Sequence, residues 1–69
     1  MTDTERQDFW QMLTVAHRQA RRHDGEVETK RFRQGYRDAL LDLWAKFTGQ
    51  PPTDTYAELE ESYLARMGG

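Results

Sequence analysis

The sequence predicts an all-α fold, a small three-helix up-down-up bundle made of a long helical hairpin and a shorter third helix. Three separate segments carry apolar residues at intervals of three and four, which is the spacing of amphipathic helices. Glycine and proline separate the segments, and no segment has the pattern of a strand. A chain of 69 residues is expected to form a single helical domain, residues 1–69.

The first helix is predicted over residues 3–22. Thr2 and Glu5 have the spacing of a capping box, in which a hydroxyl and a carboxylate satisfy backbone N–H groups at the helix start. Gly25 is expected to end the helix region because glycine adopts the left-handed conformation common after a helix. The predicted apolar stripe consists of Phe9, Met12, Leu13, Ala16 and Ala20.

The second helix is predicted over residues 28–48. Its expected core stripe falls within about 100° of a helical wheel, with Trp44 at the margin of the stripe. Gly49 and the prolines after it cannot continue the helix. The stripe consists of Phe32, Tyr36, Ala39, Leu40, Leu43 and Phe47.

The third helix is predicted over residues 54–67, with Thr53 or Thr55 as its cap. Short connections favour antiparallel neighbours, so we expect the third helix to lie across the groove of the hairpin. Its expected apolar face consists of Tyr56, Leu59, Tyr63 and Met67, with Leu64 alongside.

Charge is unevenly distributed along the chain, with seven cations against three carboxylates in residues 16–37 and an acidic excess on either side. The hairpin gathers these cations at its tip, where they are candidates for binding phosphates or an acidic protein surface. The favoured interpretation is that they complement a helix C-terminus and their own acidic neighbours, because Asp24, Glu26 and Glu28 lie in the same tip and reduce its positive field. This predicted basic tip consists of Arg18, Arg21, Arg22, Lys30, Arg31 and Arg33.

The third helix is acidic, and two interpretations of its carboxylates remain open. They could imitate a phosphate backbone and occupy the site of a nucleic-acid-binding protein, or they could form an ordinary solvated face. The predicted acidic helix surface consists of Asp54, Glu58, Glu60 and Glu61.

A hydrophobic patch is predicted on the second helix around Leu41, which lies about 140° from the centre of the expected core stripe. Tryptophan and arginine beside an exposed leucine have the composition of an interface hot spot. Alternatively, the third helix covers Trp44, and Leu41 is a solitary exposed residue. The predicted patch consists of Trp10, Arg37, Leu41 and Trp44.

No residue pattern indicates catalysis, and we expect the chain not to be an enzyme. His17 and His23 do not share a helix face as a pair of metal ligands would, so they are interpreted as surface histidines. The chain has no cysteine. We expect no catalytic residue, no metal site and no cofactor.

The expected function is a small intracellular protein-binding regulator, adaptor or inhibitor that occupies a partner's surface, of a kind typical of phage- or mobile-element-encoded proteins. Another protein is the expected partner, with a homodimer as one form of it. The alternatives are a nucleic-acid-associated protein that uses the basic tip, and an antitoxin-like or oligomer-forming helical protein. No secretory signal or membrane-spanning run is evident, so a cytoplasmic location without membrane contact is expected.

Overall fold

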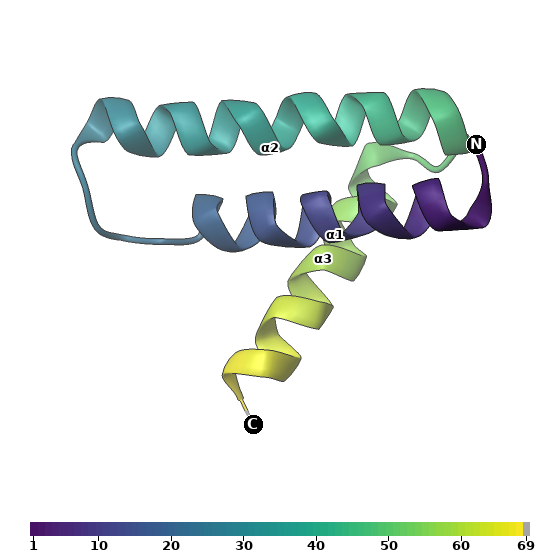
Figure 1. The fold of residues 1–69 in the computed structure, drawn as a ribbon. Helices are drawn as coiled ribbons and strands as arrows, with labels where there is room; N and C mark the ends of the chain where they lie inside the picture. The colour runs from purple at the N-terminus through teal and green to yellow at the C-terminus, as the bar shows by residue number, and fades with distance from the viewer. Residues whose placement is uncertain (69) are drawn as a thin grey trace.

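The computed structural model describes residues 1–68 and confirms the all-α, three-helix architecture. Helix α1 spans Asp3–Ala20, α2 spans Val27–Thr48 and α3 spans Pro52–Met67. The first two helices form an antiparallel hairpin, and α3 crosses it on one side, with contacts between every pair of helices (Figure 1).

The helix ends follow local chemistry. Thr2 and Glu5 form the predicted capping box, in which the backbone N–H of Glu5 donates to Thr2 Oγ1 at 3.1 Å and that of Thr2 donates to Glu5 Oε1 at 3.0 Å. Helix α2 ends at Gly49, whose φ of 77° is in the left-handed region that favours glycine.

Helices α1 and α3 depart from their predicted bounds. Helix α1 stops at Ala20, two residues before the predicted end. Helix α3 begins at Pro52, and neither Thr53 nor Thr55 caps it, because Pro51 is the N-cap residue. Proline fits the first helical position, since its fixed φ is already helical and its missing N–H would have no partner there.

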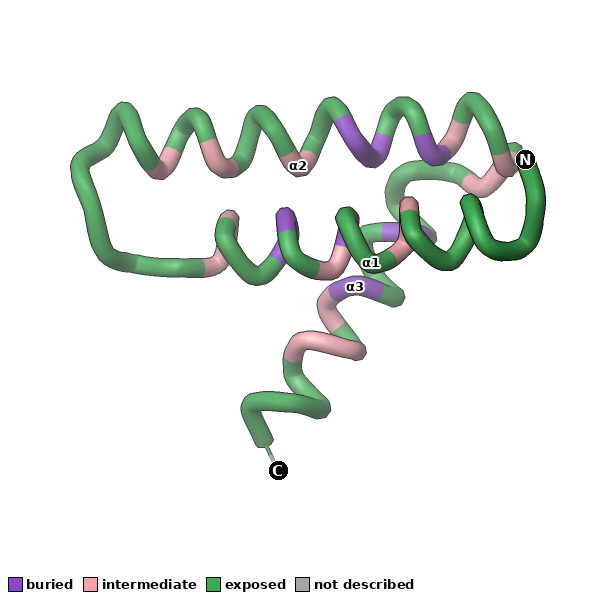
Figure 2. Tube along the Cα trace, viewed as in Figure 1, coloured by how far each residue is buried: buried purple, intermediate pink, exposed green. Residues whose placement is uncertain are grey.

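The core lies where α3 crosses the hairpin, toward the end at which the chain passes from α2 to α3 (Figure 2). Phe9 and Trp10 pack against it from α1. The half of α2 nearer the tip, residues 27–39, contains no buried residue. The buried apolar cluster consists of Leu13, Ala16, Leu40, Leu41, Trp44 and Leu59.

The predicted core stripe of α2 is therefore wrong for most of its members, because only Leu40 is buried and the others are exposed. Helix α2 is rotated so that Leu41 and Trp44 face α1 and α3 instead. On α1, Leu13 and Ala16 are buried as predicted, but Met12 is half exposed. On α3, Leu59 is buried, whereas Tyr56, Leu64 and Met67 are exposed.

Candidate functional site

The predicted hydrophobic patch is not an exposed surface on this fold. Leu41 is only 5% exposed and Trp44 only 3%, so the prediction that Leu41 faces solvent is wrong. Both side chains belong to the same core cluster as Leu59 of α3. The physical reason is that α3 packs on this side of the hairpin, where two large apolar side chains release the most water on burial.

The remaining two members of the patch support the core. The half-buried Trp10 ring lies 5.3 Å from the Trp44 ring, centroid to centroid. Arg37 is largely buried, and its Nη1 lies 3.3 Å from Nδ1 of His17 in α1. The four residues thus stabilise contacts between the helices.

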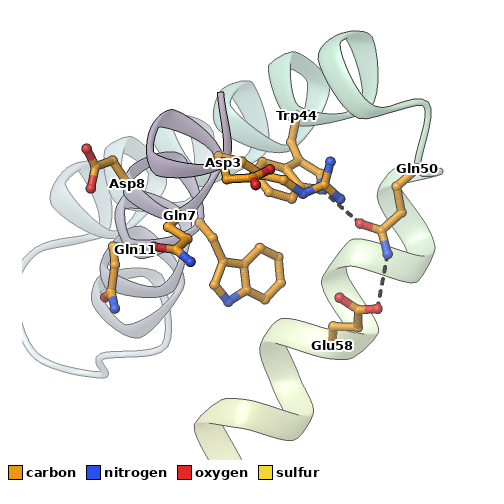
Figure 3. Close-up of a pocket in the computed structure, with 9 residues that line it drawn as sticks. Asp3, Gln7, Asp8, Gln11, Trp44, Gln50 and Glu58 are labelled. Carbon is orange, nitrogen blue, oxygen red and sulfur yellow. Dashed lines mark hydrogen bonds between the residues drawn. The ribbon is translucent and has the colours of Figure 1, made fainter. Parts of the chain in front are cut away.

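A hollow of about 820 Å³ lies between the start of α1 and the start of α3, beside Trp10 and Trp44 (Figure 3). Trp44 Nε1 donates to Gln50 Oε1 at 2.8 Å, and Gln50 Nε2 donates to Glu58 Oε1 at 3.1 Å. The other lining residues are mostly polar, and the carboxylates of Asp3 and Asp8 are exposed to water.

The predicted basic tip is partly neutralised by its own chain. Asp24 accepts two hydrogen bonds from Arg22, from Nε at 2.9 Å and from Nη2 at 2.6 Å, and Arg33 Nη1 lies 3.7 Å from the same carboxylate. The Arg22 contacts hold the pKa of Asp24 below its ordinary value, so it is ionised at neutral pH. Arg21 Nε lies 3.1 Å from Glu60 of α3. Half of the six predicted cations therefore lie close to a carboxylate of the same chain.

The predicted acidic helix surface does not act as one array. Glu60 is half-buried against α1, and Glu58 accepts a hydrogen bond from Gln50. Asp54 and Glu61 are exposed on the helix. The four carboxylates thus point to different surroundings, which weakens the interpretation that they imitate a phosphate backbone.

His17 is the largest departure from the predicted side-chain roles, because it is 1% exposed and not a surface residue. Its Nε2 lies 2.6 Å from Glu60 Oε1 of α3, and its Nδ1 lies 3.3 Å from Arg37 Nη1 of α2. The imidazole meets Tyr56 edge to face, with ring centroids 5.2 Å apart. One side chain thus connects all three helices.

The contacts of His17 specify its protonation state. Arginine can only donate, so Nδ1 must accept from Arg37, and the ring hydrogen then lies on Nε2 and is donated to Glu60. Burial lowers the pKa of His17, and the nearby arginines lower it further, whereas Glu60 opposes them. The neutral imidazole is therefore the form that the fold stabilises. Its position four residues after Leu13, on the buried face of α1, was the sequence signal for this role.

An exposed apolar face is shared by α1 and α2, and we call it the hairpin face. Its large side chains are between 42% and 73% exposed. Most of them belong to the stripes that were predicted to form the core. The hairpin face consists of Met12, Val15, Phe32, Tyr36, Leu43 and Phe47.

Two grooves cross the hairpin face between α1 and α2. One passes from Met12 and Val15 to Phe32 and Tyr36, whose rings stack with their centroids 6.4 Å apart. The other passes from Phe9 and Met12 to Phe47. Neither groove is lined by a residue of α3. The hairpin face therefore lies on a side of the hairpin that the third helix does not cover.

Residues 1–68 contain no group of three histidine, aspartate or glutamate side chains placed to hold a metal ion. In the same part of the chain, no helix combines the length and the apolar character needed to cross a membrane. No protein-family model matches the chain, and no curated protein or solved structure is significantly similar to it.

Proposed function

We propose that this chain is a protein-binding module that acts as a regulator, adaptor or inhibitor, and that the hairpin face is the surface with which it binds its partner. The observation that carries the proposal is the exposure of six large apolar side chains, from Met12 to Phe47, on one side of the hairpin. Monomeric proteins rarely expose contiguous apolar surfaces larger than a few hundred Å², and those that do commonly bind another protein there.

The energetics favour coverage of this face. A fully buried aromatic side chain covers about 150–250 Å², and the face carries three aromatic rings, those of Phe32, Tyr36 and Phe47. Removing such area from water contributes about 25 cal/mol per Å². Even partial coverage then offsets several kcal/mol of the entropy lost on association.

Nucleic-acid binding through the basic tip has less support. Asp24 and Glu60 lie against three of the six tip cations, and Glu26 and Glu28 add negative charge beside them. Counterion release scales with the number of cations free to contact phosphates, so these neighbours weaken the expected affinity.

A photo-crosslinking experiment tests the proposed function. Benzoylphenylalanine replaces Phe32 or Phe47 on the hairpin face, and replaces the similarly exposed Leu64 of α3 as a matched control. After illumination in cells, positions 32 and 47 are expected to give adducts of defined mass with protein, and position 64 none. Equal labelling at all three positions, or no adduct from 32 and 47, would overturn the proposal.

A further inference from the structure

The charges beside the hairpin face are arranged along α2 in a way that indicates what covers it. On a helical wheel, Glu28 and Lys46 lie on the same line, about 80° from Tyr36, whereas Arg31 and Asp42 lie about 120–140° from Tyr36, toward the back of the helix. All four side chains are exposed, and none forms an ion pair within residues 1–68. The rim of the hairpin face, which consists of Glu28 and Lys46, is thus acidic near the start of α2 and basic near its end.

The rim charges of one α2 helix are complementary to those of a second α2 helix that runs in the opposite direction. When two α2 helices run antiparallel, one register places Glu28 opposite Lys46 of the second copy at both ends of the contact. Nearly the same register sets Phe32 against Leu43 of the second copy, so the apolar and charged pairings agree. Opposite charges at such flanking positions are the usual means by which paired helices select orientation.

Symmetry leaves two ways to stack two hairpin faces. A two-fold axis along the helices would place the two basic tips at the same end of the dimer and would set each α2 against α1 of the other copy. A two-fold axis across the helices places each basic tip beside the acidic start of the other α1, where Glu5 and Asp8 are exposed. Like charges in contact are unfavourable, so the second arrangement is selected.

The backbone near the centre of this arrangement allows close approach. Gly35 and Ala39 are small, exposed and one turn apart on the rim side of α2, about 100° and about 60° from Tyr36, and they lie opposite each other in the antiparallel register. A methyl group added at Gly35 would meet no atom of its own chain within 4 Å. Nothing inside the protomer accounts for a glycine in the middle of α2, where glycine lowers helix stability.

The exposed apolar area of the hairpin face is also close to the area that a dimer interface buries. From the exposed fractions of its six side chains, the hairpin face offers on the order of 600 Å² per copy. A standard interface buries about 800 Å² per partner. The rim side chains and the grooves around Met12 supply the remainder.

We propose that the partner of the hairpin face is a second copy of this chain, packed antiparallel about a two-fold axis across the helices. The α1 and α2 helices of the two copies form a four-helix core, and each α3 lies on the outside. This inference rests on the proposed function and names the partner for it.

The first test is the mass of the full chain in solution, measured by size-exclusion chromatography with light scattering up to about 100 µM, where a micromolar dimer would be assembled. The expected mass is twice the 8.2 kDa of one chain. The Leu43→Arg variant is expected to raise the dissociation constant by about 30-fold or more, as loss of a hot-spot residue does. Its helical circular dichroism should be retained, because Leu43 is exposed in the protomer.

The second test fixes the register and uses the absence of cysteine from the natural chain. Chains that carry Glu28→Cys or Lys46→Cys are oxidised separately and as an equal mixture. The mixture is expected to form a covalent dimer of the two variants, while each variant alone stays mostly uncrosslinked because its thiols lie about five helical turns apart. Efficient crosslinking of each variant alone would mean parallel helices and would overturn the inference.

The outcomes separate this inference from the proposed function. A chain that stays monomeric throughout, yet gives crosslinks to another protein from positions 32 and 47, overturns the second copy as partner and leaves the proposed function standing. A dimer whose affinity is unchanged by Leu43→Arg overturns the inference, and the absence of position-32 and position-47 adducts would then overturn the proposed function as well.

Discussion

Replacing Trp44 by alanine is expected to lower the free energy of unfolding by about 3–5 kcal/mol, the usual cost of removing a buried aromatic side chain. Trp44 contacts Phe9 and Trp10 with ring centroids 5.3 Å away, and its indole N–H donates to Gln50 in the connection between α2 and α3. A domain of this size has only a few kcal/mol of stability. The variant is therefore expected to be largely unfolded by circular dichroism at room temperature.

Phe47 is the matched control, because it is an aromatic residue of the same helix that is exposed on the hairpin face. In dilute samples that contain the monomer, Phe47→Ala is expected to change the urea unfolding free energy by less than about 1 kcal/mol. Two leucines give the same contrast: Leu41→Ala is expected to cost about 2–4 kcal/mol, and Leu43→Ala much less. If Leu43→Ala and Phe47→Ala destabilise the monomer more than Leu41→Ala and Trp44→Ala, the orientation assigned to α2 is wrong.

Replacing His17 by alanine is expected to cost about 2–3 kcal/mol, because it leaves the partners of a buried hydrogen-bonded group unsatisfied. Both Glu60 and Arg37 lose a hydrogen bond, and the contact of the imidazole with Tyr56 is removed. Since these partners belong to α2 and α3, the variant should loosen the docking of α3. Relative to the natural chain, the variant is expected to show a larger increase in amide hydrogen exchange at residues 56–63 than in α1.

The same network predicts a pH dependence with a definite sign. The pKa of His17 is lowered in the folded protein from its ordinary value of 6.5, so the unfolded chain binds the proton more readily. The free energy of unfolding is then highest above pH 6.5 and falls as the pH drops from 6.5 through the lowered pKa of the folded state.

Urea titrations at pH values of about 7.5 and about 5.5 measure this change. The exposed His23 provides the control: His23→Gln should keep the pH dependence, and His17→Gln should reduce it. Unchanged stability between the two pH values in the natural chain would contradict the assignment of a neutral, buried imidazole.

The elements of the fold were predictable because they depend on local chemistry. Spacing of apolar residues located three helices, and the capping pair of Thr2 and Glu5 fixed the start of α1. Gly49 likewise fixed the end of α2. The start of α3 was missed because Pro52 acts as a first helical residue, a role that proline fills as readily as it ends a helix.

The face of α2 that forms the core was not predictable in the same way. This helix carries two apolar stripes, one centred on Tyr36 and Leu43 and one on Leu41 and Trp44, and both have helical spacing. Periodicity identifies an apolar stripe but not its partner. The first stripe is larger, yet only the second meets α3. The stripe left over is the hairpin face, so the mistaken prediction of the core located the candidate site.

The roles of the polar side chains could be predicted only where their partners are close in sequence. His17 lies on the buried stripe of α1. Its burial is favourable because Arg37 of α2 and Glu60 of α3 form hydrogen bonds with the imidazole. Contacts between residues far apart in sequence cannot be inferred from spacing. By contrast, Asp24 neutralises Arg22 two residues away, and that pairing was open to inference from the sequence.

Fluorine NMR of the chain labelled with 4-fluorophenylalanine tests most directly whether protein covers the hairpin face. The chain has three phenylalanines, of which Phe9 packs on the core and Phe32 and Phe47 lie on the face. With a dissolved paramagnetic agent, we expect the partly buried Phe9 to be broadened less than Phe32 and Phe47 at high dilution, and Phe32 and Phe47 to become protected as the chain is concentrated. Equal broadening of Phe32 and Phe47 at all concentrations, together with no protection by any added protein, would contradict the account.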